Sequence, residues 1–126
     1  MRVRVAFGVL EEVLQRNDGD LVASPLGLRH PDHLATAAAC LEVALRRPAL
    51  RWLLYEDAIY RADRGATEEA MGRVTESGFE LEPVECVVDD RKRAAIDCYT
   101  SQLKGLGDLV RDAYEPERYW TLVRRA

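Results

Sequence analysis

The sequence has few of the residues on which metal, redox and covalent catalytic sites usually depend. Its 126 residues include two histidines and three cysteines, and the cysteines form no Cys-x-x-Cys pair. A disulfide framework or a structural zinc ribbon is therefore not expected, and buried free thiols are the default expectation. A phosphate-cradling glycine loop, a Ser-His-Asp set and a Cys-His pair are also missing. Function classes that rest on those motifs are not supported by this sequence.

Long apolar runs and excess basic charge are missing as well. No segment approaches the ~20 apolar residues of a membrane-spanning helix, and the N-terminus lacks the apolar core and cleavage site of a signal peptide. The chain has 18 Lys and Arg against 22 Asp and Glu, a net charge of −4. That balance argues against nucleic acid or an anionic membrane as the main partner. We expect a cytoplasmic protein with neither kind of partner.

The apolar pattern predicts a single α/β domain over residues 1–126. The hydrophobic fraction of 48% is ordinary for a chain with a true core. Helical spacing marks one set of segments, and short apolar or alternating runs between turn signals mark the strands. Helices are predicted at 5–16, 31–47, 66–77 and 89–103, strands at 21–24, 50–57, 79–88 and 117–123, and a turn at 17–20.

Details of the pattern predict where these segments lie. Pro83 inside the third strand favours a sheet edge. In the second helix, the expected buried face comprises Leu34, Ala37, Ala38, Leu41 and Leu45. The element order indicates a partial Rossmann-like three-layer α/β fold with a mostly parallel sheet. So few strands would expose a sheet edge or face. We infer that strand–helix units are missing on the N-terminal side, and that a homo-oligomer could cover the exposed sheet.

The two histidines lie in one loop that opens a helix. His30 and His33 are three residues apart, with Pro31 and Asp32 between them. Pro31 suits the first helical position, and residues three apart share one side of a helix. A loop after a strand is where open α/β sheets place ligand sites. Two imidazoles and a carboxylate there predict part of a zinc site, although a catalytic zinc normally has three protein ligands and a water.

Simpler interpretations of the same residues stay open. In one such interpretation, the histidines only cap the helix and meet solvent. Arg29 would pair with a substrate anion, pair with Asp32, or simply be solvated. Glu56 and Asp57 end a strand, and a solvated strand terminus is favoured there over a role as outer partners of a metal ligand. The tyrosines and tryptophans are expected to pack in the core or at an edge rather than to bind sugar.

Three stretches and a short closing segment resemble the PIG-L/LmbE family of zinc-dependent N-deacetylases, in the same order. Residues 25–34, followed by an alanine-rich helix, are similar to the family's second metal motif. Residues 53–60 resemble the strand that commonly ends in a Tyr-Glu-Asp-like run. Residues 92–103 resemble the late helix with its Lys…Ala…Tyr-x-Ser-Gln signature, and residues 117–120 resemble the closing segment. The likeness spans roughly residues 5–122.

The resemblance implies removal of an N-acetyl group from an N-acetylglucosamine-type conjugate with the aid of Zn²⁺. His33 would be a zinc ligand, His30 would polarise the carbonyl or protonate the leaving amine, and Asp32 would orient His30. Gln102, with Arg29, would contact substrate. The family's earlier Ala-His-Pro-Asp-Asp-Glu motif, source of the other ligands and the general base, has no counterpart in this sequence. The expected protein is thus an incomplete or truncated family member, or alternatively a non-catalytic binding or regulatory domain that keeps the fold.

Overall fold

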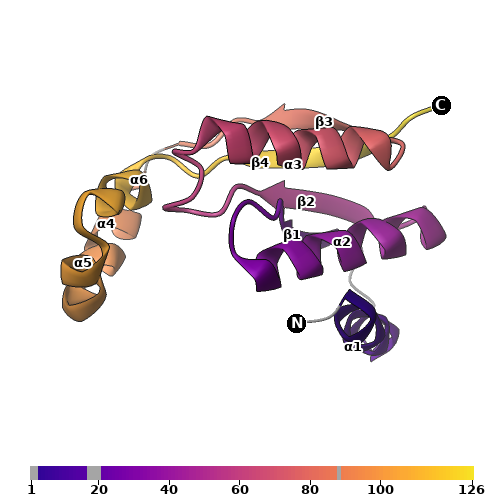
Figure 1. Ribbon diagram of the computed structural model, residues 1–126, viewed down its shortest axis with the longest axis horizontal. Helices are drawn as coiled ribbons and strands as arrows, with labels where there is room; N and C mark the ends of the chain where they lie inside the picture. Colours follow the sequence, from indigo (N-terminus) through magenta and orange to yellow (C-terminus); the bar gives the residue numbers. More distant parts are fainter. Residues whose placement is uncertain (1–2, 17–20, 88) are drawn as a thin grey trace.

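The computed structural model describes residues 3–16, 21–87 and 89–126, which form a four-stranded sheet with helices packed on it (Figure 1). The predicted turn at 17–20 lies outside the described residues. In chain order the elements are α1 (Val3–Arg16), β1 (Leu21–Pro25), α2 (Pro31–Arg46), β2 (Arg51–Tyr55), α3 (Arg64–Glu76), β3 (Phe79–Val84), α4 (Asp90–Asp97), α5 (Thr100–Leu106), the 3-10 helix η1 (Gly107–Leu109), α6 (Val110–Tyr114) and β4 (Tyr119–Arg124).

The strand order β1-β2-β4-β3 confirms the α/β class and corrects the predicted strand directions. β1 and β2 are parallel, and α2 connects them. β4, however, lies between β2 and β3 and is antiparallel to both. β1, β2 and β3 therefore run in one direction and β4 runs against them, so the sheet is mixed, and the prediction of a mostly parallel sheet is corrected for β4 alone. β3, which contains Pro83, is at an edge as predicted, and β1 forms the other edge.

Helices α2 and α3 cover the same side of the sheet and enclose the main core with it. Ala70 and Val43, one from each helix, are completely buried. The core is built mostly from small and branched side chains, with Trp52, Leu54 and Phe79 supplied by the strands. On the opposite side, alternate residues of the edge strands, among them Leu21 and Glu80, are exposed. Only part of a three-layer arrangement is thus present in the described residues.

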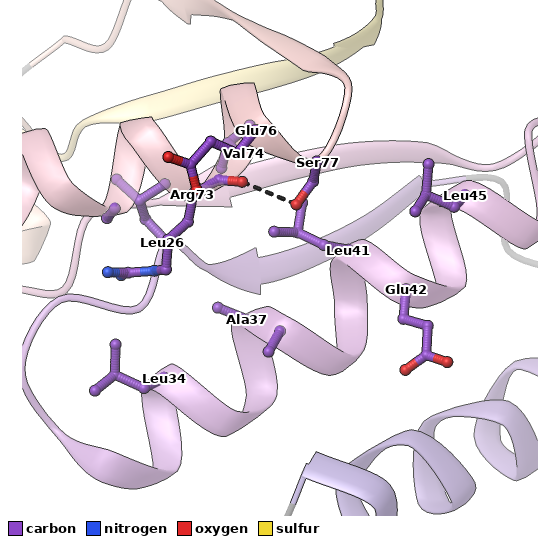
Figure 2. A pocket seen from close by; sticks show the side chains of 12 residues that line it. Leu26, Leu34, Ala37, Leu41, Glu42, Leu45, Arg73, Val74, Glu76 and Ser77 are labelled. Atoms are coloured by element: carbon purple, nitrogen blue, oxygen red, sulfur yellow. Dashed lines mark hydrogen bonds between the residues drawn. The ribbon is translucent and has the colours of Figure 1, made fainter.

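The predicted buried face of α2 is rotated relative to the observed one. Leu45 is 41% exposed and Ala38 is also exposed, while the fully packed positions include Cys40 and Val43. Two partners cause this difference, because α1 packs on one side of α2 and the sheet on another. The predicted residues instead line a groove between α2 and α3, with a volume of about 440 Å³ (Figure 2).

The late helix predicted at 89–103 is two short helices. α4 ends at Asp97, and α5 begins at Thr100 after a break at Cys98 and Tyr99. Neither helix has a buried residue, so no core contact enforces a continuous helix. Together with α6 they extend away from the sheet (Figure 1).

Two further expectations from composition are tested by the described residues. All three cysteines are free, but only Cys40 is buried; Cys86 is half-buried and Cys98 is exposed. The default expectation of buried thiols is therefore correct for Cys40 alone. Among the described helices, none combines the length and the apolar character needed to cross a bilayer.

Gly27 shapes the loop that leads from β1 to the histidines. Its φ of +81° lies in the left-handed region that side chains disfavour. A Cβ atom at Gly27 would lie 2.7 Å from the Cβ of Ala37 on α2. The carbonyl of Gly27 also accepts a hydrogen bond of 2.5 Å from Arg73 of α3. The loop therefore passes close to α2 only because residue 27 has no side chain.

We expect Gly27→Ala to destabilise the protein by about 1–3 kcal/mol, through backbone strain and the contact with Ala37. Gly72→Ala is the matched control, because Gly72 lies within α3 and a Cβ there would meet no atom within 4 Å. That change should be neutral or stabilise by up to ~1 kcal/mol. Urea unfolding of both variants measures the difference, and equal stabilities would contradict the prediction.

Candidate functional site

The histidine loop and the end of β2 meet because β1 and β2 are parallel. Pro25 and Tyr55 are partners at the ends of these strands, and the amide of Leu26 donates to the carbonyl of Tyr55 at 2.7 Å. The segments that follow, 26–33 and 56–61, therefore emerge side by side. This edge, at the carboxyl ends of parallel strands, is where α/β sheets place their ligand sites.

Asp57 connects the two segments through both carboxylate oxygens. Asp57 as a whole is only 3% exposed to solvent. Oδ2 accepts a hydrogen bond of 3.0 Å from the amide of Leu28, and Oδ1 lies 2.9 Å from Nδ1 of His33. Within the described part of the chain both atoms are buried and neither makes a hydrogen bond, so the 2.9 Å approach is an ion-pair contact. The carboxylate and the imidazole are therefore available only to each other.

This contact fixes which nitrogen of His33 is free. A carboxylate only accepts hydrogen bonds, so it favours the ring form that has its proton on Nδ1. The lone pair of the neutral ring is then on Nε2. Carboxylate–histidine pairs of this kind orient metal-ligating imidazoles and increase their basicity. The side chain of His33 is 41% exposed, which leaves the ring accessible to a ligand, and the ring of Tyr60 contacts it edge-on at 6.4 Å between centroids.

In His30 the roles of the two ring nitrogens are the reverse of those in His33. It is the N-cap of α2, and its Nδ1 accepts a hydrogen bond of 3.3 Å from the amide of Asp32. The neutral ring therefore has its proton on Nε2, where it is a donor. The two rings lie 5.2 Å apart between centroids, tilted by 48°. One neighbouring imidazole thus offers a lone pair and the other offers a proton.

The potential metal ligands at this site would satisfy the coordination of a divalent metal ion only in part. His33, with its free Nε2 and its carboxylate partner, is suited to bind Zn²⁺. No group of three or more His, Cys, Asp and Glu side chains that could hold a metal ion occurs in residues 3–16, 21–87 and 89–126. A catalytic zinc normally has three protein ligands, so the described residues do not form a complete site of that kind.

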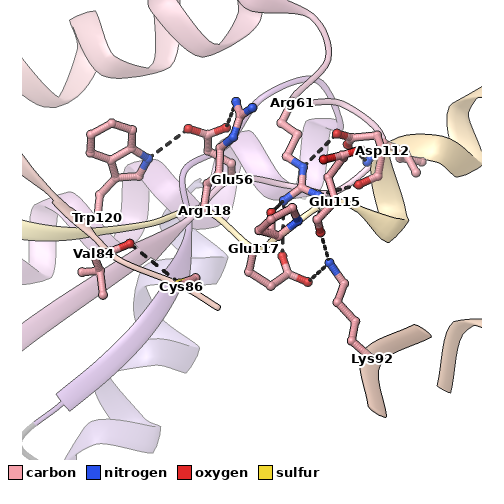
Figure 3. Close-up of polar contacts among 12 residues, drawn as sticks. Glu56, Arg61, Val84, Cys86, Lys92, Asp112, Glu115, Glu117, Arg118 and Trp120 are labelled. Atoms are coloured by element: carbon pink, nitrogen blue, oxygen red, sulfur yellow. Dashed lines mark hydrogen bonds and ion pairs between the residues drawn. The ribbon is translucent and has the colours of Figure 1, made fainter. Parts of the chain in front are cut away.

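Glu56 and Arg61, which flank Asp57, are buried as well (Figure 3). Glu56 is 2% exposed, and its carboxylate accepts hydrogen bonds from the indole of Trp120 at 3.0 Å and from Arg118 at 3.4 Å. Arg61 forms an ion pair of 2.9 Å with Asp112. The expectation of a solvated strand terminus at Glu56 and Asp57 is therefore wrong. The sequence signal for this burial is a pair of acidic residues directly after an apolar strand. The residues that contact these acids, however, are distant in sequence.

The remaining predicted site residues lie in different places. Arg29 pairs with Asp63, the N-cap of α3, rather than with Asp32. Asp32 is close to His30, but the contact between them comes from its backbone amide. Gln102 is exposed on α5, where its side chain accepts a hydrogen bond of 2.7 Å from Ser101, and none of its described contacts reaches the histidines. The roles assigned to these residues in a reaction stay predictions.

A similar fold is found in the crystal structure of the antimicrobial reagent A40926 pseudoaglycone deacetylase Dbv21. The TM-score is 0.65 and the sequence identity is 24%; the match covers 98% of this chain and 57% of that protein. The chain thus spans little more than half the length of the deacetylase that it matches. No protein-family model matches the sequence, and no curated protein matches it. The likeness shows a shared fold.

We expect Asp57→Asn to reverse the proton position on His33. The asparagine amide would present a donor to Nδ1, so the proton of the neutral ring would move to Nε2. Long-range ¹H–¹⁵N NMR spectra of the imidazoles, recorded where both rings are neutral, report this directly. The spectrum of His30, which contacts Asp32 instead, serves as an internal control. An unchanged His33 pattern would show that Asp57 does not set its ring form.

The ion pair at Arg29 yields a second prediction. Arg29 lowers the pKa of Asp63 through a hydrogen bond and its positive charge, aided by the backbone amide of Ala66. A lowered pKa in the folded state stabilises the protein above the unfolded pKa, and this contribution is lost as the pH falls through the folded pKa. Arg29→Met should therefore raise the pKa of Asp63 toward its ordinary value and move acid unfolding to higher pH. A carboxyl NMR titration of Asp63 measures the shift; an unaltered pKa would contradict it.

Proposed function

We propose that this chain is the histidine-bearing part of a metal-dependent amide hydrolase, of the PIG-L/LmbE type, that removes an N-acetyl group from an amino-sugar conjugate. The main support is the pair of neighbouring imidazoles with opposite free nitrogens at the carboxyl end of β1. The fold shared with a deacetylase over 98% of the chain is consistent with this. The remaining metal ligands and the general base would come from outside the described residues.

His33 would bind the metal through Nε2, and Asp57 would keep its ring in the required orientation. A bound zinc ion would supply Lewis-acid polarisation of the acetyl carbonyl and a water of lowered pKa. Asp57 is rigidly held, because its second oxygen accepts the amide of Leu28. The imidazole of His33 therefore loses little conformational entropy when it binds a ligand.

His30 would act on the other side of the amide. Its Nε2–H would donate a hydrogen bond to the carbonyl oxygen. Transfer of a proton to the departing amine would require the imidazolium form, in which Nδ1 is also protonated and no longer accepts the amide of Asp32. The ring is held by its own backbone, since Nδ1 accepts the amide of Asp32 at the start of α2. Proton transfer by one positioned group typically contributes ~10²–10⁴ in rate. Arg29 and Gln102 remain candidate substrate contacts.

A non-catalytic binding or regulatory domain is the second candidate. The described residues contain no group of three potential metal ligands, which is the specific observation in its favour. Such a domain would keep the fold and a pocket for the sugar conjugate while lacking the chemistry. The two proposals differ in one measurable respect, namely whether an N-acetyl group is released when metal is present.

We expect zinc-loaded protein, expressed together with any polypeptide encoded in frame before residue 1, to release acetate from an N-acetylglucosamine conjugate. His33→Ala should lower both zinc content and hydrolysis. His30→Gln should keep zinc while reducing hydrolysis by ~10²–10⁴, because only the proton donor is lost. Zinc is measured by elemental analysis and acetate by an enzyme-coupled assay.

Arg46→Ala provides the control for these substitutions. Arg46 is in the last turn of the same helix, where it pairs with Glu42, and its removal should change neither zinc content nor hydrolysis. Hydrolysis that survives His33→Ala would refute the assignment of His33. Binding of the conjugate without acetate release at any zinc concentration would instead support the binding-domain proposal.

A further inference from the structure

The turn that presents Asp57 contains a strained residue. Ile59 has a φ of +67°, and it is the one residue other than glycine with a positive φ among those described. A β-branched residue is a clear outlier in this region. Such a conformation costs on the order of 1–3 kcal/mol and persists only where surrounding contacts impose it. The contacts at Ile59 therefore indicate what holds the turn.

Asp112 of α6 supplies those contacts. Its Oδ2 accepts a hydrogen bond of 2.6 Å from the amide of Ile59, and its Oδ1 accepts one of 2.9 Å from Nε of Arg61. The two donors are the strained residue and a residue two positions later, so a single carboxylate spans the turn. The side chain of Asp112 is 13% exposed and that of Arg61 is 1% exposed.

Arg61 joins the same turn to the main chain that precedes β4 (Figure 3). Its guanidinium donates to the carbonyls of Asp112 at 2.5 Å, Pro116 at 2.8 Å and Glu115 at 3.2 Å. A buried guanidinium with this many acceptors is fixed in one geometry. Removal of the Asp112 carboxylate would leave the buried cation without its closest charge partner, which is costly.

Asp57 begins this turn, so its position depends on the same contacts. The carbonyl of Asp57 accepts hydrogen bonds from the amides of Tyr60 at 3.2 Å and Arg61 at 3.1 Å. Its carboxylate reaches Leu28 and His33 on the other segment. A connected series of contacts thus runs from Asp112 through residues 57–61 to the imidazole of His33.

We propose that Asp112 is a positioning residue, which holds the 57–61 turn in its strained form and thereby keeps the Asp57 carboxylate against Nδ1 of His33. The importance of His33 rests on the proposed function, but the geometry does not. The competing explanation is that Asp112 merely anchors α6 to the body of the protein. Only the first explanation connects Asp112 to the proton position on His33.

The test is NMR spectroscopy of the ¹⁵N-labelled full chain with Asp112→Asn. An asparagine oxygen cannot accept from Ile59 and Arg61 as a carboxylate does with two oxygens. We expect the Ile59 amide to exchange at least ~10-fold faster, as local opening becomes easier. The His33 ring should change from one form, with the proton on Nδ1, to a mixture of both forms.

Two further variants separate positioning from anchoring. Asp97→Ala removes the hydrogen bond of 2.5 Å that Tyr114 of α6 donates to Asp97 of α4, so it loosens the same helix without touching the turn, and both readouts should stay unchanged. Ile59→Gly combined with Asp112→Asn should restore the His33 ring form, because glycine adopts positive φ without steric cost.

The proposal is overturned if Asp112→Asn folds and leaves the His33 ring form unaltered, or if Asp97→Ala disturbs it equally. If Asp112→Asn fails to fold, the rates of amide exchange in the unmodified protein test the proposal instead. The amides of Ile59 and Leu28 should then open together with similar protection, whereas exchange of Ile59 ~10-fold faster than Leu28 would refute the coupling. None of these readouts requires hydrolysis, so failure of the proposed function would be seen separately, as absence of acetate release.

Discussion

The contact of the buried Asp57 carboxylate with Leu28 and His33 is the interaction on which this end of the molecule depends. Burial of a carboxylate is costly unless its oxygens find hydrogen-bond donors. Here one oxygen accepts a backbone amide, which cannot be lost, and the other lies 2.9 Å from an imidazole nitrogen on the first turn of α2. Removal of either partner leaves a buried polar group unsatisfied, at a cost of about 1–3 kcal/mol. The Asp57 side chain therefore joins the β1–α2 loop to the β2–α3 segment, in addition to the strand pairing and the contact of Arg29 with Asp63.

Stability alone gives little reason for such an arrangement. Glu56, Asp57 and Arg61 are all nearly inaccessible to water and lie within six residues. Buried ion pairs often contribute no more to stability than apolar residues of similar size would. Clusters of this kind occur preferentially where a protein must hold titratable groups in a fixed geometry. The partners of the three residues come from the start of α2 and from the segment before and within β4. The cluster thus brings the early and late parts of the chain together behind the histidines, where a rigid support would serve a ligand site.

The sequence predicts the local elements well and their assembly less well. The helical spacing of α1 and α3 and the short apolar runs of β1 and β2 are local properties, and these elements form where the pattern places them. The direction of β4 is not local, because a short alternating run fits either a parallel or an antiparallel neighbour. The predicted buried face of α2 differs from the observed one for a similar reason. Both α1 and the sheet bury this helix, and the spacing of its apolar residues reveals neither partner. The break at Cys98 follows from the lack of any core contact along α4 and α5. The burial of Asp57 was missed because it depends on His33 and on Arg61, whose own partner is 51 residues away in sequence.

The two histidines show why spacing could indicate the site but could not assign its chemistry. From sequence alone, His30 and His33 are two equivalent imidazoles on one side of a helix. The fold makes them different, since one ring faces a carboxylate and the other accepts a backbone amide. A carboxylate leaves Nε2 of His33 as an electron-pair donor, and the amide leaves Nε2 of His30 as a proton donor. A ligand placed between the rings would therefore meet a Lewis base on one side and an acid on the other. The form of the His30 ring follows from its capping of α2 alone, whereas that of His33 depends on Asp57 from another segment of the chain.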